Sequence, residues 1–280
     1  MIIQDSIMLA AKTLRKNNIK SPILDSELLL SEVIKKDRKY IIFNSKKKLS
    51  KKSVIDFKRL VERRKRGEPV AYLTNYKEFW KQKYYVNQNV LIPRPDTEVL
   101  IEETLKIYQS DKKLNFLDIG TGSGCLLLSI LHERKNFTGY GIDISKKAIN
   151  SAKFNAKLQH LSNRAKFYNS DIDKFFIGKY DLIISNPPYI KNSDLKYLDK
   201  DISCFEPKVA LDGGCDGFAK ITKVISRASN LIKKSGKFIL EIGCHQRYKT
   251  IKKLEDNNFF INKIIKDYGN NDRCIVSTKI

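Results

Sequence analysis

The chain has 280 residues, enough for one large domain and a small one. Its 54 lysines and arginines outnumber its 31 acidic residues, which gives a formal net charge of +23. No stretch approaches the roughly 18 consecutive apolar residues of a membrane helix, and the first residues lack the pattern of a secretory signal. We therefore expect a cytoplasmic protein without a membrane partner.

The cysteines and histidines are scattered through the chain in a way that argues against disulfides and metal sites. The five cysteines and three histidines never adopt the paired spacing of metal ligands, so we expect reduced thiols and no metal site. A basic surface can attract nucleic acid or an acidic partner, but lysine runs are also ordinary solvated faces. Direct nucleic-acid binding therefore stays open, and a monomer is expected.

Residues 1–75 are predicted to form a small helical domain. Ser21-Pro22 favours a helix start, with the serine as cap and the proline in the first turn. Residues 50–66 carry apolar side chains at helical spacing, and Gly67 marks the end of that helix. The helix that starts at Ser21-Pro22 is expected to place four apolar residues on one face: Leu24, Leu28, Val33 and Ile34.

Residues 76–92 alternate aromatic, polar and apolar side chains, which favours a short hairpin that links two domains. Trp80 is the only tryptophan, and we expect it to pack in a core. Pro95 and the acids beside it then favour the start of a helix.

The remainder, residues 93–280, is predicted to be a doubly wound α/β domain, because strands and helices alternate along it. A long stretch without periodicity, residues 190–217, is expected to be a loop that covers a substrate. Strands are predicted near residues 114, 139, 165, 181 and 237, with two more near 260 and 273.

A glycine-rich loop directly follows the first of these strands. Glycines let the chain turn tightly from strand to helix and let a ligand approach the backbone. A dinucleotide fingerprint has glycines at positions one, three and six, whereas this loop has them at one, three and five. The pattern favours a smaller nucleoside ligand. The loop consists of Gly120, Thr121, Gly122, Ser123 and Gly124.

Acidic residues follow the next two strands. Asp143 lies 23 residues after Gly120, close to the spacing at which an acid receives ribose hydroxyls. It is alternatively a helix cap before Ser145. Asp171 and Ile172 follow the third strand, where they are placed to reach an adenine, although Asp171 is also readable as a plain loop acid.

The motif Asn186-Pro187-Pro188-Tyr189 follows an apolar run that is predicted to be a buried parallel strand. Ligands of such sheets lie outside the carboxyl ends of the strands. The asparagine offers an acceptor and a donor, the prolines leave stiff carbonyls that only accept, and the tyrosine offers an aromatic face. This set suits a planar NH2 group, and a simple proline turn is the alternative.

Together the glycine loop, Asp143 and the Asn-Pro-Pro-Tyr motif resemble those of class I S-adenosylmethionine-dependent methyltransferases that act on an amino group. More narrowly, the chain resembles the release-factor glutamine methyltransferases, the HemK/PrmC family, over nearly its whole length. Phe205 and Ile172 depart from that pattern, because relatives often carry tyrosine and an aromatic residue there. The likeness also rests on residues 91–98, 206–214, 240–243, Gln246 and Asp272-Arg273.

The resemblance implies a seven-stranded methyltransferase sheet in residues 93–280 and an N-terminal domain that helps to hold a protein substrate. The implied substrate is the glutamine of the Gly-Gly-Gln motif of peptide chain release factors. Its amide is expected to donate one N–H to the Asn186 side chain and the other to the Pro187 carbonyl, with Tyr189 packed on the amide plane. The implied catalytic residues are Asn186, Pro187, Pro188 and Tyr189. The implied S-adenosylmethionine contacts are Gly120, Thr121, Gly122, Ser123, Gly124, Asp143, Asp171, Ile172 and Asn186.

Three other functions fit the same motifs. One is methylation of a glutamine in a ribosomal protein. Another is amino-group methylation of adenine or cytosine, which requires base flipping and for which the chain offers no separate basic, aromatic recognition domain. The last is a methyltransferase fold kept as a non-catalytic RNA-binding module; the intact glycine loop, Asp143 and Asn186 argue against it.

Overall fold

A computed structural model describes residues 1–109, 112–267 and 269–280. The chain divides into two compact units. The first unit contains Met1–Tyr76 and Asp199–Phe205, and the second contains Lys77–Leu198 and Glu206–Ile280. The chain therefore leaves the second unit once, after Leu198, and returns to it at Glu206.

The first unit is helical, as predicted. α4 begins after Ser50, whose Oγ accepts the N–H of Ser53 at 3.0 Å, and the chain turns at Gly67 with a φ of +101°. Phe57 and Val61 of α4 are buried in the core of the unit, so the predicted apolar stripe is confirmed. The helices are α1 (Ile3–Lys16), α2 (Pro22–Ile34), α3 (Arg38–Phe43), α4 (Lys51–Lys65), α5 (Val70–Thr74) and α9 (Lys200–Phe205).

The predicted face of α2 was half right. Its start at Pro22 is confirmed, and Val33 and Ile34 pack against the core of the unit as predicted. Leu24 and Leu28 are exposed, and Leu29 and Leu30 are buried instead. Three consecutive leucines allow more than one apolar face, and packing against α1 and α4 selects one of them. Within the described residues, the Ser21 side chain makes no capping hydrogen bond.

The hairpin predicted at the start of the second unit is present but shorter than residues 76–92. Its strands are β1 (Tyr76–Phe79) and β2 (Gln82–Tyr85). Trp80 occupies the turn with a φ of +44°. It is half-buried and packs against the large hydrophobic core of the second unit, so the expected core packing is confirmed. Its Nε1–H donates to Glu133 Oε1 at 2.9 Å, which holds the indole against that core.

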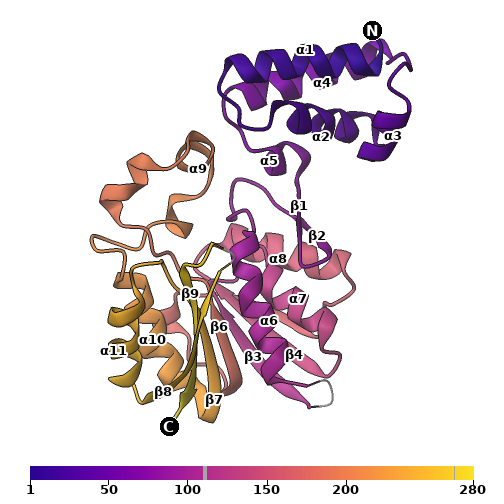
Figure 1. Cartoon of the computed structure of the whole chain (residues 1–280). Coiled ribbons are helices and arrows are strands. Elements are labelled where there is room, and N and C mark those ends of the chain that lie inside the picture. The colour runs from indigo at the N-terminus through magenta and orange to yellow at the C-terminus, as the bar shows by residue number, and fades with distance from the viewer. Residues whose placement is uncertain (110–111, 268) are drawn as a thin grey trace. The chain divides into compact units, whose positions relative to one another are not determined.

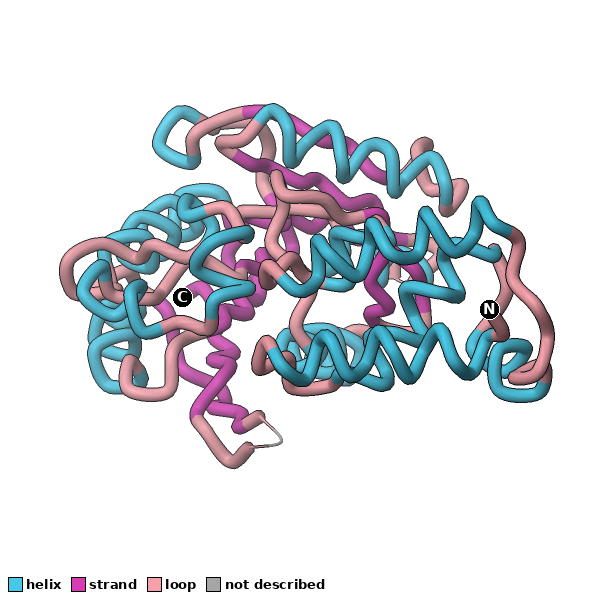
Figure 2. Tube along the Cα trace, turned by 90° about the horizontal axis from the view of Figure 1, so that it is seen from above, coloured by secondary structure: helices cyan, strands magenta, loops and turns pink. Residues whose placement is uncertain are grey.

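Seven strands form one sheet within the described part of the chain, in the order β5-β4-β3-β6-β7-β9-β8, and β9 runs antiparallel to both of its neighbours, β7 and β8. The doubly wound α/β fold and all the predicted strands are confirmed (Figures 1 and 2). The strands are β3 (Leu114–Ile119), β4 (Phe137–Asp143), β5 (Ala165–Asn169), β6 (Tyr180–Ser185), β7 (Ile232–Glu241), β8 (Phe259–Lys266) and β9 (Asp272–Lys279).

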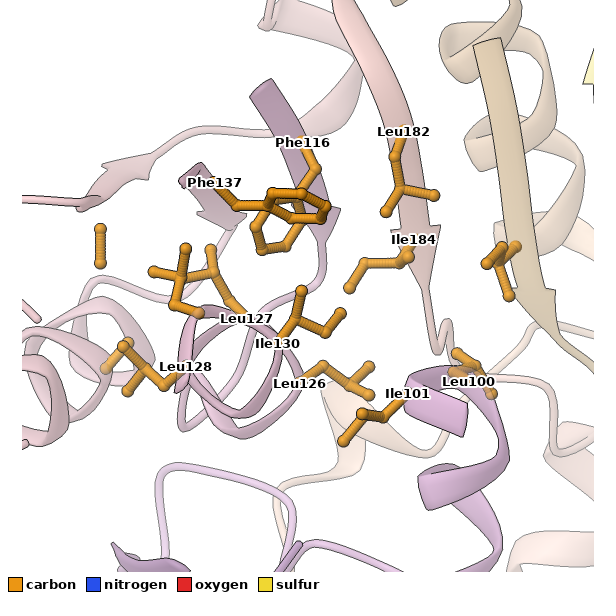
Figure 3. Close-up of a cluster of buried hydrophobic side chains, with 14 of the residues drawn as sticks. Leu100, Ile101, Phe116, Leu126, Leu127, Leu128, Ile130, Phe137, Leu182 and Ile184 are labelled. Atoms are coloured by element: carbon orange, nitrogen blue, oxygen red, sulfur yellow. The ribbon is translucent and has the colours of Figure 1, made fainter. Parts of the chain in front are cut away.

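Helices cover both faces of this sheet because successive side chains of a strand point to opposite sides. Leu182 of β6 belongs to the core under α6, α7 and α8, and its neighbour Ile183 belongs to the core under α10 and α11. Figure 3 shows Phe116 and Phe137 of the strands beside Leu127 of α7. The helices are α6 (Glu98–Ile107), α7 (Cys125–Glu133), α8 (Lys146–Leu158), α10 (Ala219–Leu231) and α11 (Arg247–Glu255).

The strand register brings the loops that follow β3, β4 and β6 to the same end of the sheet. Ile119 at the end of β3 pairs with Ile142 of β4 and with Ser185 of β6. The residues that follow these strands therefore emerge side by side, at the crevice where ligands of open α/β sheets bind. No helix of the described residues is both long and apolar enough to cross a bilayer.

A buried ion pair joins two helices of the first unit. Arg64 Nε donates to Asp25 Oδ2 at 2.7 Å, and Arg64 Nη1 donates to the carbonyls of Gly67 and Glu68. The pair therefore links α2 to the turn that ends α4.

Replacing Arg64 with alanine is expected to lower the free energy of unfolding by about 3–5 kcal/mol, because the Asp25 carboxylate would remain buried without its partner. Urea denaturation followed by circular dichroism measures the loss. Arg66→Ala is the matched control, since Arg66 is exposed near the same helix end, and its effect should stay below about 0.5 kcal/mol. Equal losses in both variants would contradict the assignment.

Candidate active site

A pocket of about 170 Å³ lies within the second unit at the carboxyl ends of β3, β4, β5 and β6. Side chains from α10 and from residues 207–210 also line it. Eight residues singled out from the sequence are brought together in its lining: Gly120, Gly122, Asp143, Asp171, Ile172, Asn186, Pro187 and Pro188.

The glycine loop is held against the end of β4 by backbone hydrogen bonds. The N–H groups of Gly120 and Thr121 both donate to the Ile142 carbonyl at 2.9 Å. Gly120 has a φ of +76°, and a Cβ added there would meet nothing within 4 Å. The requirement for glycine at this position is therefore conformational, and the space beside the backbone is open to a ligand.

The other residues of the loop support it and do not belong to the described pocket lining. Thr121 Oγ1 donates to the buried Asp118 Oδ2 at 2.7 Å. Ser123 is buried. Gly124 precedes α7, and a Cβ there would lie 3.2 Å from the Cβ of Ala152. Of the five loop residues, only Gly120 and Gly122 line the described pocket, and Thr121, Ser123 and Gly124 support the loop from behind.

Asp143 connects the loop, the end of β4 and the pocket. Its Oδ2 accepts the N–H of Gly122 at 3.0 Å, and its Oδ1 accepts the N–H of Ser145 at 2.8 Å. The cap of α8 is Ser145, whose Oγ accepts the N–H of Ala148. Burial raises the pKa of Asp143, and the two N–H groups oppose that rise. Each carboxylate oxygen keeps a further lone pair, so Asp143 can still accept hydroxyl hydrogens from a ligand.

Asp171 and Ile172 lie on the pocket wall after β5. The Asp171 side chain accepts the N–H of Asp173 at 3.1 Å and so caps the short 3₁₀ helix Ile172–Lys174. Ile172 also packs against the core under α10 and α11. Asp171 therefore has a structural role in addition to its place in the lining.

Asn186 is oriented by a neighbour that is distant in sequence. Its Nδ2 donates to Thr97 Oγ1 at 3.1 Å. This bond leaves Oδ1 as the part of the Asn186 side chain that can accept from a ligand. Pro187 is buried and Pro188 is half-buried, and both line the pocket after Asn186.

Tyr189 differs from the other three residues of its motif, because its side chain does not line the described pocket. Its hydroxyl donates to Glu241 Oε1 and accepts from Arg273 Nη1, both at 3.3 Å. Its carbonyl accepts from Gln246 Nε2 at 3.1 Å. Burial raises the pKa of the Tyr189 hydroxyl, so it stays a hydrogen-bond donor at neutral pH.

Two buried carboxyl groups near the site were given no role from the sequence. Burial raises the pKa of Glu241 to about 7 and that of Asp118 to about 7. Glu241 ends β7 directly after the apolar run of residues 238–240. The same signal, an acid at the carboxyl end of a buried strand, singled out Asp143, so sequence reasoning could have found Glu241.

Glu206 is a further buried acid that sequence reasoning did not assign. Its Oε2 accepts the N–H of Ile92 at 3.1 Å, and its Oε1 accepts from Arg94 Nη2. Glu206 thereby ties the segment before α6 to the pocket wall, which continues at Pro207. Within the described ranges, no group of three or more His, Cys, Asp or Glu side chains could hold a metal ion.

Two known domain families match different parts of the chain. Residues 6–74 match the PrmC N-terminal domain, and residues 110–276 match a methyltransferase domain. In solved structures, the chain is similar to a methyltransferase from Pyrococcus furiosus, with a TM-score of 0.53 and 17% identity over 70% of this chain and 88% of the other. That likeness identifies the class I methyltransferase fold.

Curated relatives agree over nearly the full length. A release factor glutamine methyltransferase of Fusobacterium nucleatum is 37% identical over 95% of this chain and 76% of its own length. The enzyme with the same name from Buchnera aphidicola subsp. Baizongia pistaciae is 36% identical, with complete coverage of both chains. These relatives and the two domain matches show that the chain belongs to the release factor glutamine methyltransferase family.

Proposed function

We propose that the protein transfers a methyl group from S-adenosylmethionine to the side-chain amide nitrogen of the glutamine in the Gly-Gly-Gln motif of peptide chain release factors. The observation that carries this proposal is the orientation of Asn186. Its NH2 group is engaged by Thr97, which leaves a carbonyl oxygen at the pocket to receive the NH2 group of a substrate amide.

The residues of the pocket fit S-adenosylmethionine. Gly120 leaves open space beside the backbone, and the Asp143 carboxylate can accept both hydroxyls of a ribose. Asp171 and Ile172 lie on the wall where an adenine would be received. When bound, S-adenosylmethionine supplies an electrophilic methyl group.

An amide nitrogen is a poor nucleophile because its lone pair is delocalised into the carbonyl group. The protein therefore has to orient the amide. The Asn186 Oδ1 accepts one N–H and the Pro187 carbonyl accepts the other, so positive charge that develops on the nitrogen is stabilised by two fixed dipoles. Holding the amide in one orientation contributes several kcal/mol more, by the general scale of proximity effects.

This chemistry needs no strong base. As the nitrogen gains the methyl group its proton becomes acidic and is released. The nearby buried carboxyl groups, Glu241 and Asp118, do not belong to the described pocket lining, so they are not placed to take that proton directly. The proposed packing of Tyr189 on the amide plane remains a prediction, since its hydroxyl is tethered to Glu241 and Arg273.

The substrate can be tested with labelled cofactor and three acceptors, namely a release factor, ribosomal proteins and DNA. Label is expected on the release factor alone. A release factor in which the glutamine of its Gly-Gly-Gln motif is replaced by alanine is the control and should stay unlabelled. Label on ribosomal protein or DNA, but not on the release factor, would contradict the proposal.

Asn186→Ala should lower turnover by about 100- to 1000-fold, the usual loss when one fixed transition-state hydrogen-bond partner is removed. The affinity for S-adenosylhomocysteine should change by less than about threefold, because the substrate contact is removed and the ribose contact is kept. Single-turnover kinetics and calorimetry measure the two quantities. Asn230→Ala, at an exposed position near the end of α10, should behave like wild type; a similar result for Asn186→Ala would refute its role.

Asp143→Ala should raise the Kd for S-adenosylhomocysteine by at least about tenfold, since hydrogen bonds to a charged acceptor contribute roughly 1.5–3 kcal/mol. Titration calorimetry measures this change. Asp181→Ala is the matched control, because Asp181 lies at the opposite end of β6 and pairs with Lys233. Unchanged affinity in the Asp143 variant would rule out ribose binding by this residue.

A further inference from the structure

Thr97 is a buried hydroxyl in contact with the motif residue Asn186. It is 4% exposed and ends the short 3₁₀ helix Pro95–Thr97 before α6. Its Oγ1 accepts from Asn186 Nδ2 at 3.1 Å. A hydroxyl both donates and accepts, and buried polar groups are nearly always satisfied. The hydrogen of the Thr97 hydroxyl therefore requires an acceptor of its own.

Glu241 offers a buried oxygen as a candidate for this acceptor. It is 1% exposed, and its Oε1 accepts the Tyr189 hydroxyl. Within the described residues, its buried Oε2 has no hydrogen-bond partner of ordinary geometry. Burial raises the pKa of Glu241, and hydrogen bonding by the Thr97 hydroxyl is the largest influence that opposes this rise. The hydroxyl thus lies where it stabilises the charged carboxylate.

Resting on the proposed function, we propose that Thr97 and Glu241 are positioning residues that fix the rotation of the Asn186 amide. A charged carboxylate can only accept hydrogen bonds. In the proposed arrangement the Thr97 hydroxyl donates to the charged Glu241, and it then only accepts from Asn186. Only one rotation of the Asn186 amide satisfies this chain, the one with Nδ2 toward Thr97 and Oδ1 toward the pocket.

The opposite rotation of the amide would disable the site. A half-turn about the last side-chain bond of Asn186 exchanges Nδ2 and Oδ1 with little change in shape. The NH2 group of Asn186 would then face the NH2 group of the substrate amide, and two donors cannot bond to each other. Without directional hydrogen bonds, the two rotations of the Asn186 amide would have similar energies. The direction of the proposed hydrogen-bond chain favours one of them.

Arg273 favours the charged form of Glu241, which only accepts hydrogen bonds. Its guanidinium donates to Tyr189 Oη at 3.3 Å and pairs with Asp267 at 2.8 Å. The positive charge of Arg273 lowers the pKa of Glu241 against the effect of burial, whereas the negative charge of Asp96 raises it. The proposed chain of hydrogen bonds therefore runs from a fixed cation, through Tyr189, Glu241 and Thr97, to the Asn186 amide.

Thr97→Val keeps the shape of the side chain and removes the hydroxyl. It should lower kcat for release factor methylation by about 10- to 100-fold, the scale of small misplacements in a site. The Kd for S-adenosylhomocysteine should stay within about twofold of wild type, and Thr97→Ser should recover kcat to within about threefold. Thr104→Val is the matched control, since Thr104 is buried in the adjoining α6 and its hydroxyl bonds only the Leu100 carbonyl among the described residues; it should keep wild-type kcat.

The double variant distinguishes positioning from general damage. In an Asn186→Ala background, Thr97→Val should lower kcat by less than about twofold further, because a residue that acts through Asn186 has nothing left to position. Equal losses from Thr97→Val in both backgrounds, or wild-type kcat in the single variant, would overturn the proposal.

Glu241→Gln tests the direction of the chain. The glutamine amide can donate to Thr97, which releases the threonine hydrogen toward Asn186 and permits the wrong rotation. We expect kcat to fall at least about fivefold with cofactor affinity kept within about twofold, and an unchanged kcat would remove Glu241 from the proposal. If wild type itself transfers no methyl group to a release factor, the proposed function fails; if it does and Thr97→Val matches it, only the positioning role fails.

Discussion

Parallel pairing of β3 with both β4 and β6 is the constraint on which the rest of the site depends. Because Ile119 is level with Ile142 and with Ser185, the glycine loop, Asp143 and Asn186 emerge at one edge of the sheet. Side chains that are separated by more than 60 positions then share a pocket without further adjustment. Hydrogen bonds among these segments, such as that from Gly122 to Asp143, set their final geometry.

The repeating pattern of strands, the glycine loop and the proline motif could be read from the sequence because each depends on local chemistry. The buried face of α2 could not, since Leu28, Leu29 and Leu30 are alike in composition and differ only in what packs on them. The bond between Thr97 and Asn186 spans 89 positions, and nothing in either local sequence indicates the other. Contacts of this kind follow from the assembled sheet and not from a motif.

Burial of carboxyl groups is a recurring feature around the pocket. Asp118, Glu206 and Glu241 are each at most 5% exposed, and each accepts at least one hydrogen bond from a neighbouring segment. A buried carboxylate without partners costs several kcal/mol, so these groups strongly favour the conformation in which their donors are in place. Carboxyl groups outside the pocket lining therefore contribute to the rigidity of the site.

The excursion of residues 199–205 into the first unit affects how the protein can be made and divided. A ribosome finishes the N-terminal helices long before it reaches α9, so that unit gains its last helix only after β3 to β6 have been synthesised. Cutting the chain after residue 76 would leave α9, including Phe205 beside Gly67, without the surface on which it packs. The helical unit and the sheet unit are therefore coupled in biogenesis, and neither corresponds to one uninterrupted length of polypeptide.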